Sequence, residues 1–207
     1  MGMATGFHPV AIPIAPLPLA GIGEKSMNIH NAIRAKRAVR KFKSERIPER
    51  DALDILDAGR LAQSSKNMQA WHFIAITDRG LLQELSKCGE FAGHLAGAAL
   101  AVAILTPDPD LRFNVMFDAG QAAAYMQLEA FEKGIGSCLA TIYDRDRARE
   151  LLRFPEELHI RIAISFGYPS TETSRPARPG GRRQLDEVVS WERWDRGAAP
   201  HNPFKTG

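Results

Sequence analysis

The sequence LAQSSKNMQAWHFIAIT, residues 61–77, joins a polar loop directly to an apolar run. Residues 73–76 are apolar without alternation, which is the pattern of a strand covered on both faces, and residues 78–80 supply the turn that ends it. The loop side chains therefore lie at an edge of a sheet. Neutral donors and acceptors in this position suit the edge of a heterocycle better than a phosphate or a metal ion. The loop residues of this kind are Ser64, Ser65, Asn67 and Gln69.

The composition is that of one globular domain. The chain has 207 residues, of which 44% are apolar, and this is enough for a single core. Its net charge of +3 is small, but basic residues collect in residues 34–43 and 175–183. Cys88 and Cys138 lie in no metal-binding pattern, which predicts reduced thiols in a cytoplasmic protein.

Residues 1–25 are expected to form an extended N-terminal arm. They lack the early basic region of a signal peptide, and Pro13, Pro16 and Pro18 break their apolar part. The arm either stays mobile or lies along a partner surface. No apolar run in the chain is long enough to cross a bilayer, so we expect no membrane partner.

Residues 26–207 are expected to form one α+β domain, because helical and strand patterns intermix along them. Asn28 and Asp144 are good N-caps for two of the helices. Further helices are predicted after Pro48 and over residues 81–88 and 115–133, and strands over residues 73–76, 98–105, 137–142 and 160–166.

Two features predict contact with another chain. The helix over residues 115–133 is rich in small residues between 119 and 124, which would let a second helix pack closely. The C-terminal tail, from about residue 185 to 207, carries Trp191 and Trp194, and these side chains need a surface to cover them.

Several kinds of chemistry have no support in the sequence. It contains no Gly-rich phosphate loop and no HExxH, CxxC or GxSxG pattern, which disfavours P-loop, zinc and serine-hydrolase functions. His72 could serve as a general acid, but nothing near it in the sequence would tune its pKa, and we interpret it as structural.

Three motifs taken in order resemble one family. They are KRAVRKF at residues 36–42, SSKNMQAWHF at 64–73, and GIGSC at 134–138 followed by GYP at 167–169. Together they are similar to the FMN-dependent nitroreductases over about residues 28–190. The resemblance implies an α+β fold with a mixed central β-sheet flanked by helices. It also implies a homodimer with FMN at each end of the interface and a C-terminal extension exchanged across it.

The resemblance assigns roles to individual residues. Lys36 and Arg37 match the basic pair that holds the FMN phosphate, and Arg40 matches the residue near N1 and O2 of the flavin ring. Arg182 and Arg183 match a late basic position that completes the phosphate site. The loop of Ser64, Ser65, Asn67 and Gln69 matches the one that meets the flavin, partly from the opposite subunit. Ala140, Thr141 and Ile142 fall where members place backbone amides near N5.

The sequence departs from the family pattern at several positions. Ala38 replaces a serine, which removes a hydroxyl from the phosphate site, and Lys36 replaces an arginine, which exchanges a bidentate fork for a point charge. Gln63 and Ala70 replace prolines that bracket the loop. Lys87 and His94 are candidates for a further polar residue before the second strand.

The resemblance implies an oxidoreductase in which the flavin carries the redox chemistry. NADH or NADPH would reduce FMN and leave, and an electron-poor small molecule such as a nitroarene or quinone would follow in a ping-pong cycle. No protein acid or base is needed. Flavin fragmentation and reductive dehalogenation are alternatives within the family, although the connection over residues 107–114 is short for their lid. A nucleic-acid-binding protein is the alternative from another class, disfavoured by the modest charge.

Overall fold

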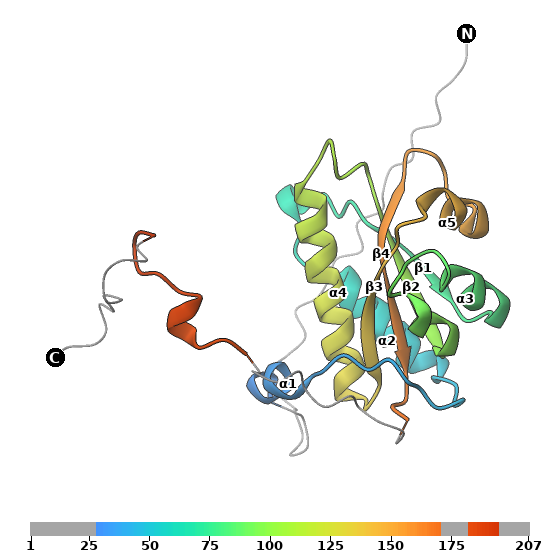
Figure 1. Ribbon diagram of the computed structural model, residues 1–207, viewed down its shortest axis with the longest axis horizontal. Helices are drawn as coiled ribbons and strands as arrows, with labels where there is room; N and C mark the ends of the chain where they lie inside the picture. The colour runs from blue at the N-terminus through green and yellow to red at the C-terminus, as the bar shows by residue number, and fades with distance from the viewer. Residues whose placement is uncertain (1–27, 171–181, 195–207) are drawn as a thin grey trace, which may run out of the picture. The chain divides into compact units, whose positions relative to one another are not determined.

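The computed structural model describes residues 28–170 and 182–194 (Figure 1). The chain divides into two compact units, Met1–Pro169 and Ser170–Gly207. The predicted arm, residues 1–25, lies outside the described residues. Whether residues 26–207 act as one domain stays a prediction.

The first unit contains five α-helices and four strands within its described residues (Figure 1). The helices are α1 (Ile29–Ala35), α2 (Glu49–Arg60), α3 (Arg79–Leu85), α4 (Asn114–Glu132) and α5 (Arg145–Leu152). The strands are β1 (His72–Ile76), β2 (Leu100–Thr106), β3 (Gly136–Thr141) and β4 (His159–Gly167). Two short 3-10 helices, η1 (Ser65–Asn67) and η2 (Gly93–Gly97), lie in the connections. The predicted caps are confirmed, since Asn28 accepts from the His30 N–H and Asp144 from the Arg147 N–H.

The four strands form one sheet in the order β1-β2-β4-β3, and every pairing between them is antiparallel. The prediction of a mixed sheet is therefore wrong for these strands. β2 and β3 do run in the same direction on either side of α4, but β4 lies between them, so they never pair. Parallel pairing among the described residues is limited to one bridge, between Ala38 and Ser137.

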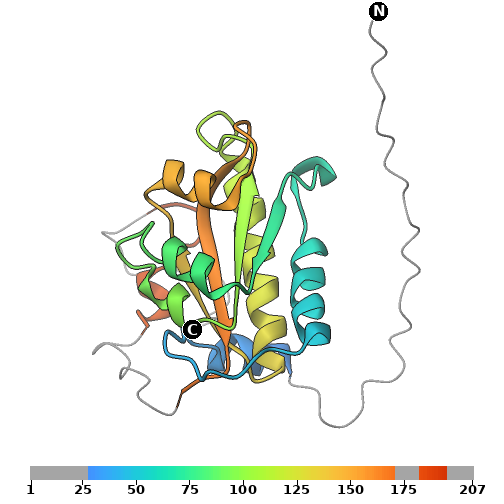
Figure 2. The same ribbon diagram turned by 90° about the vertical axis from the view of Figure 1, so that its right-hand side faces the viewer.

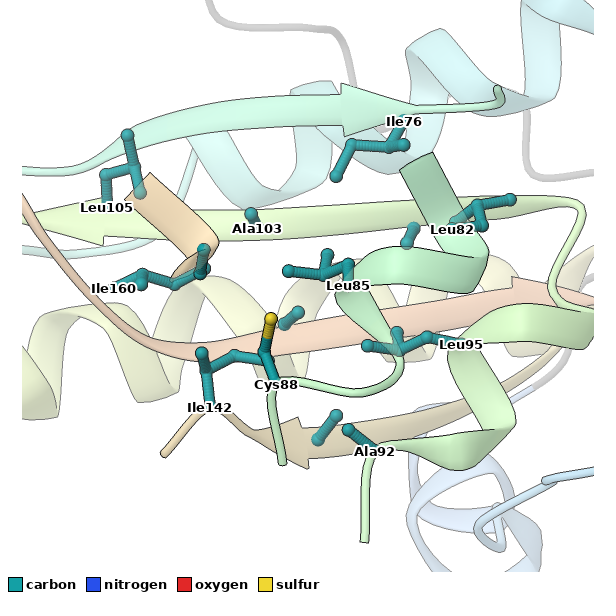
Figure 3. Packing of buried hydrophobic residues seen from close by; sticks show 14 of the residues in the cluster. Ile76, Leu82, Leu85, Cys88, Ala92, Leu95, Ala103, Leu105, Ile142 and Ile160 are labelled. Atoms are coloured by element: carbon teal, nitrogen blue, oxygen red, sulfur yellow. The ribbon is translucent and has the colours of Figure 1, made fainter. Parts of the chain in front are cut away.

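Helices cover both faces of the sheet (Figure 2). One face packs against α2 and α4, with Met126 and Phe166 among its fully buried side chains. The other packs against α3, α5 and η2 around Leu85 and Leu95, where Figure 3 shows Cys88 among apolar neighbours. Cys88 and Cys138 are both free and buried, as the prediction of unpaired thiols requires.

β1 is less enclosed than its sequence predicts. Phe73 packs toward one core and Ile74 toward the other, so both faces have neighbours. Ala75 is nevertheless exposed. The reason is the position of β1 at the edge of the sheet, which an apolar run alone does not reveal.

The small residues of α4 divide between two surfaces. Ala119, Ala122 and Ala123 are buried in the core of their own subunit. Gly120 and Ala124 are exposed on the opposite side. On the same helix and just before it, the large side chains of Phe113, Phe117 and Tyr125 are also exposed. The part of α4 available to a second helix is therefore narrower than the sequence suggests, but it is strongly apolar.

Apart from Ser170, the described part of the second unit is residues 182–194, which contain a single 3-10 turn, η3 (Leu185–Glu187), closed by a capping box between Gln184 and Glu187. Leu185 and Trp194 are exposed there. Within the described residues of the whole chain, no helix is long and apolar enough to cross a membrane. The same residues contain no cluster of side chains suited to a metal ion.

Candidate functional site

A mostly apolar pocket with two basic residues in its lining lies where the chain leaves α1 and meets the start of β3. Its volume is about 160 Å³, and Lys36, Arg37 and Ser137 line it together with Phe131 of α4. The backbone fixes this arrangement, because the Val39 N–H donates to the Ser137 carbonyl at 2.9 Å. The structure thus brings the first and third sequence motifs together.

Two glycines let the first motif lie close to the sheet. A Cβ on Gly136 would stand 2.7 Å from the Val39 Cβ, and one on Gly167 would stand 2.9 Å from the Phe42 ring. Neither distance is compatible with a side chain at these positions. Val39 and Phe42 therefore anchor the segment on the sheet, while Arg40 and Lys41 between them are exposed.

The two basic residues of the pocket differ in their surroundings. Arg37 donates from Nη1 to the carbonyls of Arg34 and Lys36, at the C-terminal end of α1, where a cation complements the helix dipole. Lys36 is half-buried, and burial lowers the pKa of its ammonium group, with a small opposing effect from Cys138. A half-buried cation that makes no ion pair in the described structure is suited to an anionic ligand.

The outer edge of β3 presents backbone groups next to this pocket. Because the Ser137 carbonyl faces outward to Val39, the two-residue alternation of a strand turns the N–H groups of Leu139 and Thr141 to the same edge. The Ile142 N–H instead donates to the Arg161 carbonyl at 2.9 Å. Of the amides predicted to approach the flavin, the Ile142 N–H is thus engaged within the sheet and the Thr141 N–H faces the outer edge. Their contact with a flavin stays a prediction.

A buried histidine lies behind this edge. His94 Nδ1 is 2.8 Å from Ser165 Oγ, and the same hydroxyl can donate to the Cys138 carbonyl at 3.3 Å. Which of Nδ1 and the Ser165 hydroxyl donates depends on the tautomer of the ring, and Nε2 has no hydrogen-bond partner among the described residues. Burial, reinforced by the charge of Arg40, lowers the pKa of His94, while the Leu139 backbone opposes the shift.

Arg40 acts on the residues around this edge and not on the pocket. It is exposed and is not among the pocket-lining residues of the described chain. Its charge disfavours protonation of His94 and favours the thiolate of Cys138, although burial raises the pKa of that thiol overall. Lys36 also acts on Cys138, and the different roles predicted for Lys36, Arg37 and Arg40 stay predictions.

The loop of residues 64–69 is held by its own polar groups and by α4. Ser64 Oγ accepts from the Gln69 N–H at 2.9 Å, and the Gln69 side chain donates to Asn67. The Ser65 N–H donates to both carboxylate oxygens of Asp118, each at 3.1 Å. Lys66, Asn67 and Gln69 all have positive φ, which non-glycine residues adopt only when their surroundings enforce it.

A single subunit keeps the loop and the pocket apart. The loop contacts α4 at Asp118, whereas Phe131 of the same helix lines the pocket. Thirteen helical residues separate them, which corresponds to about 20 Å. In Figure 1 the loop lies at one end of α4 and α1 at the other. Arg182 and Arg183 are exposed residues of the second unit, so their part in a phosphate site stays a prediction.

Two residues of this region, Asp118 and Ser137, were not predicted from the sequence, and a third, His94, was named only as a candidate. Asp118 anchors the loop from a position 53 residues away, and His94 was only one of two candidates. Ser137 is fully buried, and its hydroxyl has no partner in the described part of the chain. A serine inside an apolar strand, SCLATI, was the one signal available for it.

The chain has clear relatives among known proteins. The model of the "Nitroreductase family" matches residues 33–88 and 87–168. An NADPH-dependent oxidoreductase of Staphylococcus saprophyticus is 34% identical, over 82% of this chain and 75% of the relative. An Archaeoglobus fulgidus protein, provisionally named NADH dehydrogenase/NAD(P)H nitroreductase, is 33% identical over 68% of this chain and 84% of that protein.

A solved structure has the same fold. The FMN-dependent nitroreductase of Clostridium difficile superposes with a TM-score of 0.69 at 29% identity, and the match covers 79% of this chain and 98% of that one. The motifs that resemble this family form the pocket and the loop. Residues from 36–42 and 134–138 line the pocket, and residues 64–69 form the loop. The chain belongs to the nitroreductase family.

Proposed function

We propose that this protein is a homodimeric FMN-dependent enzyme that uses NADH or NADPH to reduce electron-poor small molecules such as nitroarenes and quinones. Its family makes it an NAD(P)H-dependent oxidoreductase. The observation that carries the proposal is a pocket lined by the half-buried Lys36 and by Ser137, whose buried hydroxyl has no partner among the described residues. Desolvated donors without acceptors of their own suit the phosphate of FMN.

The residues present fit the rest of the cofactor. The exposed edge of β3 offers the Thr141 N–H to a heterocycle, and Arg40 supplies a positive charge near that edge. When bound, FMN supplies the hydride-transfer chemistry. The chain would hold the phosphate with Lys36 and Arg37, and Arg40 would favour the negatively charged reduced ring.

The separation of about 20 Å between the loop and the pocket along α4 supports a dimer. An apolar stripe that includes Phe113, Phe117 and Tyr125 is exposed on this helix, and Ile29 and Ile33 are exposed on α1. If two copies pack α4 against α4 in opposite directions, the loop of residues 64–69 from one copy lies near the pocket of the other. A site that needs both subunits would explain why one chain separates its two halves. The tail from about residue 185 to 207 would then extend across the partner.

Buried, unpaired Cys88 and Cys138 agree with the cytoplasmic location that we propose. Nucleic-acid binding is not proposed, since the family membership accounts for the basic motif at residues 36–42.

The test begins with the purified protein. It should be yellow, release FMN on heating and melt at a higher temperature with added FMN. Turnover should then be measured with NADH and NADPH against quinones, nitroarenes and halogenated phenols, the last to detect dehalogenation. Parallel double-reciprocal plots would support the ping-pong order. A protein that neither contains nor binds FMN would contradict the proposal.

A further inference from the structure

Ser137 stands out as a fully buried polar side chain without a hydrogen-bond partner in the described structure. It is 1% exposed, and its hydroxyl has neither a donor nor an acceptor in contact. A buried hydroxyl in this condition costs stability, because it has lost its bonds to water and gained none. Such a cost is understandable where a ligand supplies the missing partner.

The strand pattern places this hydroxyl on the pocket side of the sheet. Ala140 of β3 packs into the core formed with α3 and α5. Residues one position apart on a strand point to opposite faces, so Ser137, three positions away, points to the α4 face. The pocket lies on that side, since Phe131 of α4 lines it together with Ser137, Lys36 and Arg37.

Ala38 is the direct neighbour of Ser137. The two residues form a parallel bridge, in which paired side chains lie on the same face and the backbones are about 4.8 Å apart. The resemblance described above implies a serine at the position of Ala38 in many members of the family. The hydroxyl missing from one strand of the bridge is thus present on the other.

We propose that Ser137 donates its hydroxyl proton to the phosphate group held by Lys36 and Arg37, and so replaces the hydroxyl that Ala38 lacks. The inference rests on the proposed function, because FMN is the phosphate ligand. Ser137 adds to the site a residue from the start of β3, outside the basic motif. A phosphate oxygen completes the hydrogen bonding of Ser137, and the phosphate gains a neutral donor beside two cations.

The experiment compares FMN with riboflavin, which has the same ring and ribityl chain but no phosphate. Ser137→Ala should weaken FMN binding by about ten- to a hundredfold, the loss expected for one hydrogen bond to a charged group. Riboflavin affinity should change less than about threefold. Ser165→Ala is the matched control, because it removes a buried hydroxyl from the neighbouring strand, where that hydroxyl contacts His94 and not the pocket. Ser165→Ala should leave the ratio of FMN affinity to riboflavin affinity unchanged.

Ala38→Ser provides the rescue. In the Ser137→Ala background it should restore most of the lost FMN affinity, whereas in the wild type it should add little, because the phosphate already has its hydroxyl. If Ser137→Ala does not fold, Ser137→Cys keeps nearly the same shape with a weak donor, and it should show the same selective loss of FMN.

Three outcomes overturn the inference. One is an equal loss of FMN and riboflavin, and another is no loss of either. The third is a gain of tenfold or more from Ala38→Ser in the wild type, which would mean that the phosphate had lacked a hydroxyl. The proposed function fails in a different way, namely if the wild-type protein binds neither flavin.

Discussion

Lys36 and Arg40 are four residues apart in one motif but have different surroundings. Lys36 is half-buried in the pocket, with its pKa lowered by burial. Arg40 is exposed, and its charge acts on His94 and, together with that of Lys36, on Cys138. A cation in the pocket contributes to phosphate binding in both redox states, whereas a cation near the ring favours the reduced, anionic state.

We therefore expect Arg40→Ala to change the redox potential more than the affinity. The two-electron midpoint potential of bound FMN should become more negative, by about 30 mV for each 1.4 kcal/mol of lost stabilisation. Lys36→Ala should reduce FMN affinity more strongly and change the potential less. Spectroelectrochemical titration and FMN binding assays on both variants provide the measurement. An unchanged potential in Arg40→Ala, with FMN simply lost, would place Arg40 at the phosphate instead.

His94 predicts a pH dependence of stability. Burial and Arg40 lower its pKa in the folded protein below the ordinary value of about 6.5, so the unfolded chain binds more protons than the folded one. Its contribution to the free energy of unfolding is present above about pH 6.5 and is lost as the pH falls below it. Urea denaturation of the wild type between pH 5 and 8 should show this loss, and His94→Gln should reduce it.

His159→Gln is the control for this prediction. His159 starts β4, the strand on which Ser165 lies, but it is six positions from that serine and outside the His94 hydrogen-bond chain. Its replacement removes a histidine without touching the hydrogen bonds of His94, so it shows how much a histidine substitution in itself changes the measured stability. If the free energy of unfolding depends on pH equally in the wild type and in His94→Gln, a group other than His94 is responsible.

Among the elements, the loop of residues 64–69 depends most on a single distant side chain. Asp118 is buried on α4, and both its oxygens accept from the Ser65 N–H. Asp118→Asn keeps the volume but removes one acceptor and the charge, so the loop with its positive φ angles should open more often. We expect trypsin to cut after Lys66 several times faster and FMN affinity to fall.

Limited proteolysis with mass spectrometry measures the cutting rate directly. Asp57→Asn on α2 is a suitable control, because Asp57 is exposed and paired only locally with Arg60. It should leave cutting at Lys66 unchanged. If Asp118→Asn is cut no faster than the wild type, the loop is held by its internal bonds between Ser64, Asn67 and Gln69.

The elements also show which parts of the structure a sequence reveals. Helix α4 and the caps Asn28 and Asp144 were predictable, because periodicity and capping are local. The contacts of Ser65 with Asp118 and of His94 with Ser165 span 53 and 71 residues, and no local pattern encodes them. The antiparallel sheet was missed for the same reason, since strand order depends on where β4 inserts.

The same distinction applies to the candidate site. The basic motif and the loop were found by resemblance, and the structure brings the motif to the start of β3. Resemblance alone could not distinguish Thr141 from Ile142, because the difference depends on which N–H the neighbouring strand uses. Nor could it identify Ser137, whose role becomes visible only when its bridge to Ala38 is known.

At the scale of the whole molecule, the separation of about 20 Å between the loop and the pocket along α4 is the reason for proposing a site that two subunits share. Phe117 is 71% exposed at the centre of the apolar stripe on that helix, so its replacement should not disturb the core of the subunit. Phe117→Glu would place a charge in the proposed interface, where burial without a partner is costly. We expect this variant to be a folded monomer that binds FMN at least tenfold more weakly.

Sedimentation velocity gives the mass of the variant, circular dichroism tests its fold, and an FMN titration gives the affinity. Leu53→Glu provides the control, because Leu53 is an exposed apolar residue of α2 outside the α4 stripe, and this variant should remain dimeric and yellow. A wild-type protein that sediments as a monomer while holding FMN would refute the shared site. If Phe117→Glu is a monomer with wild-type FMN affinity, the proposed α4 interface is supported, but the whole flavin site belongs to one chain. The loop and the pocket would then have to meet by a movement within the subunit.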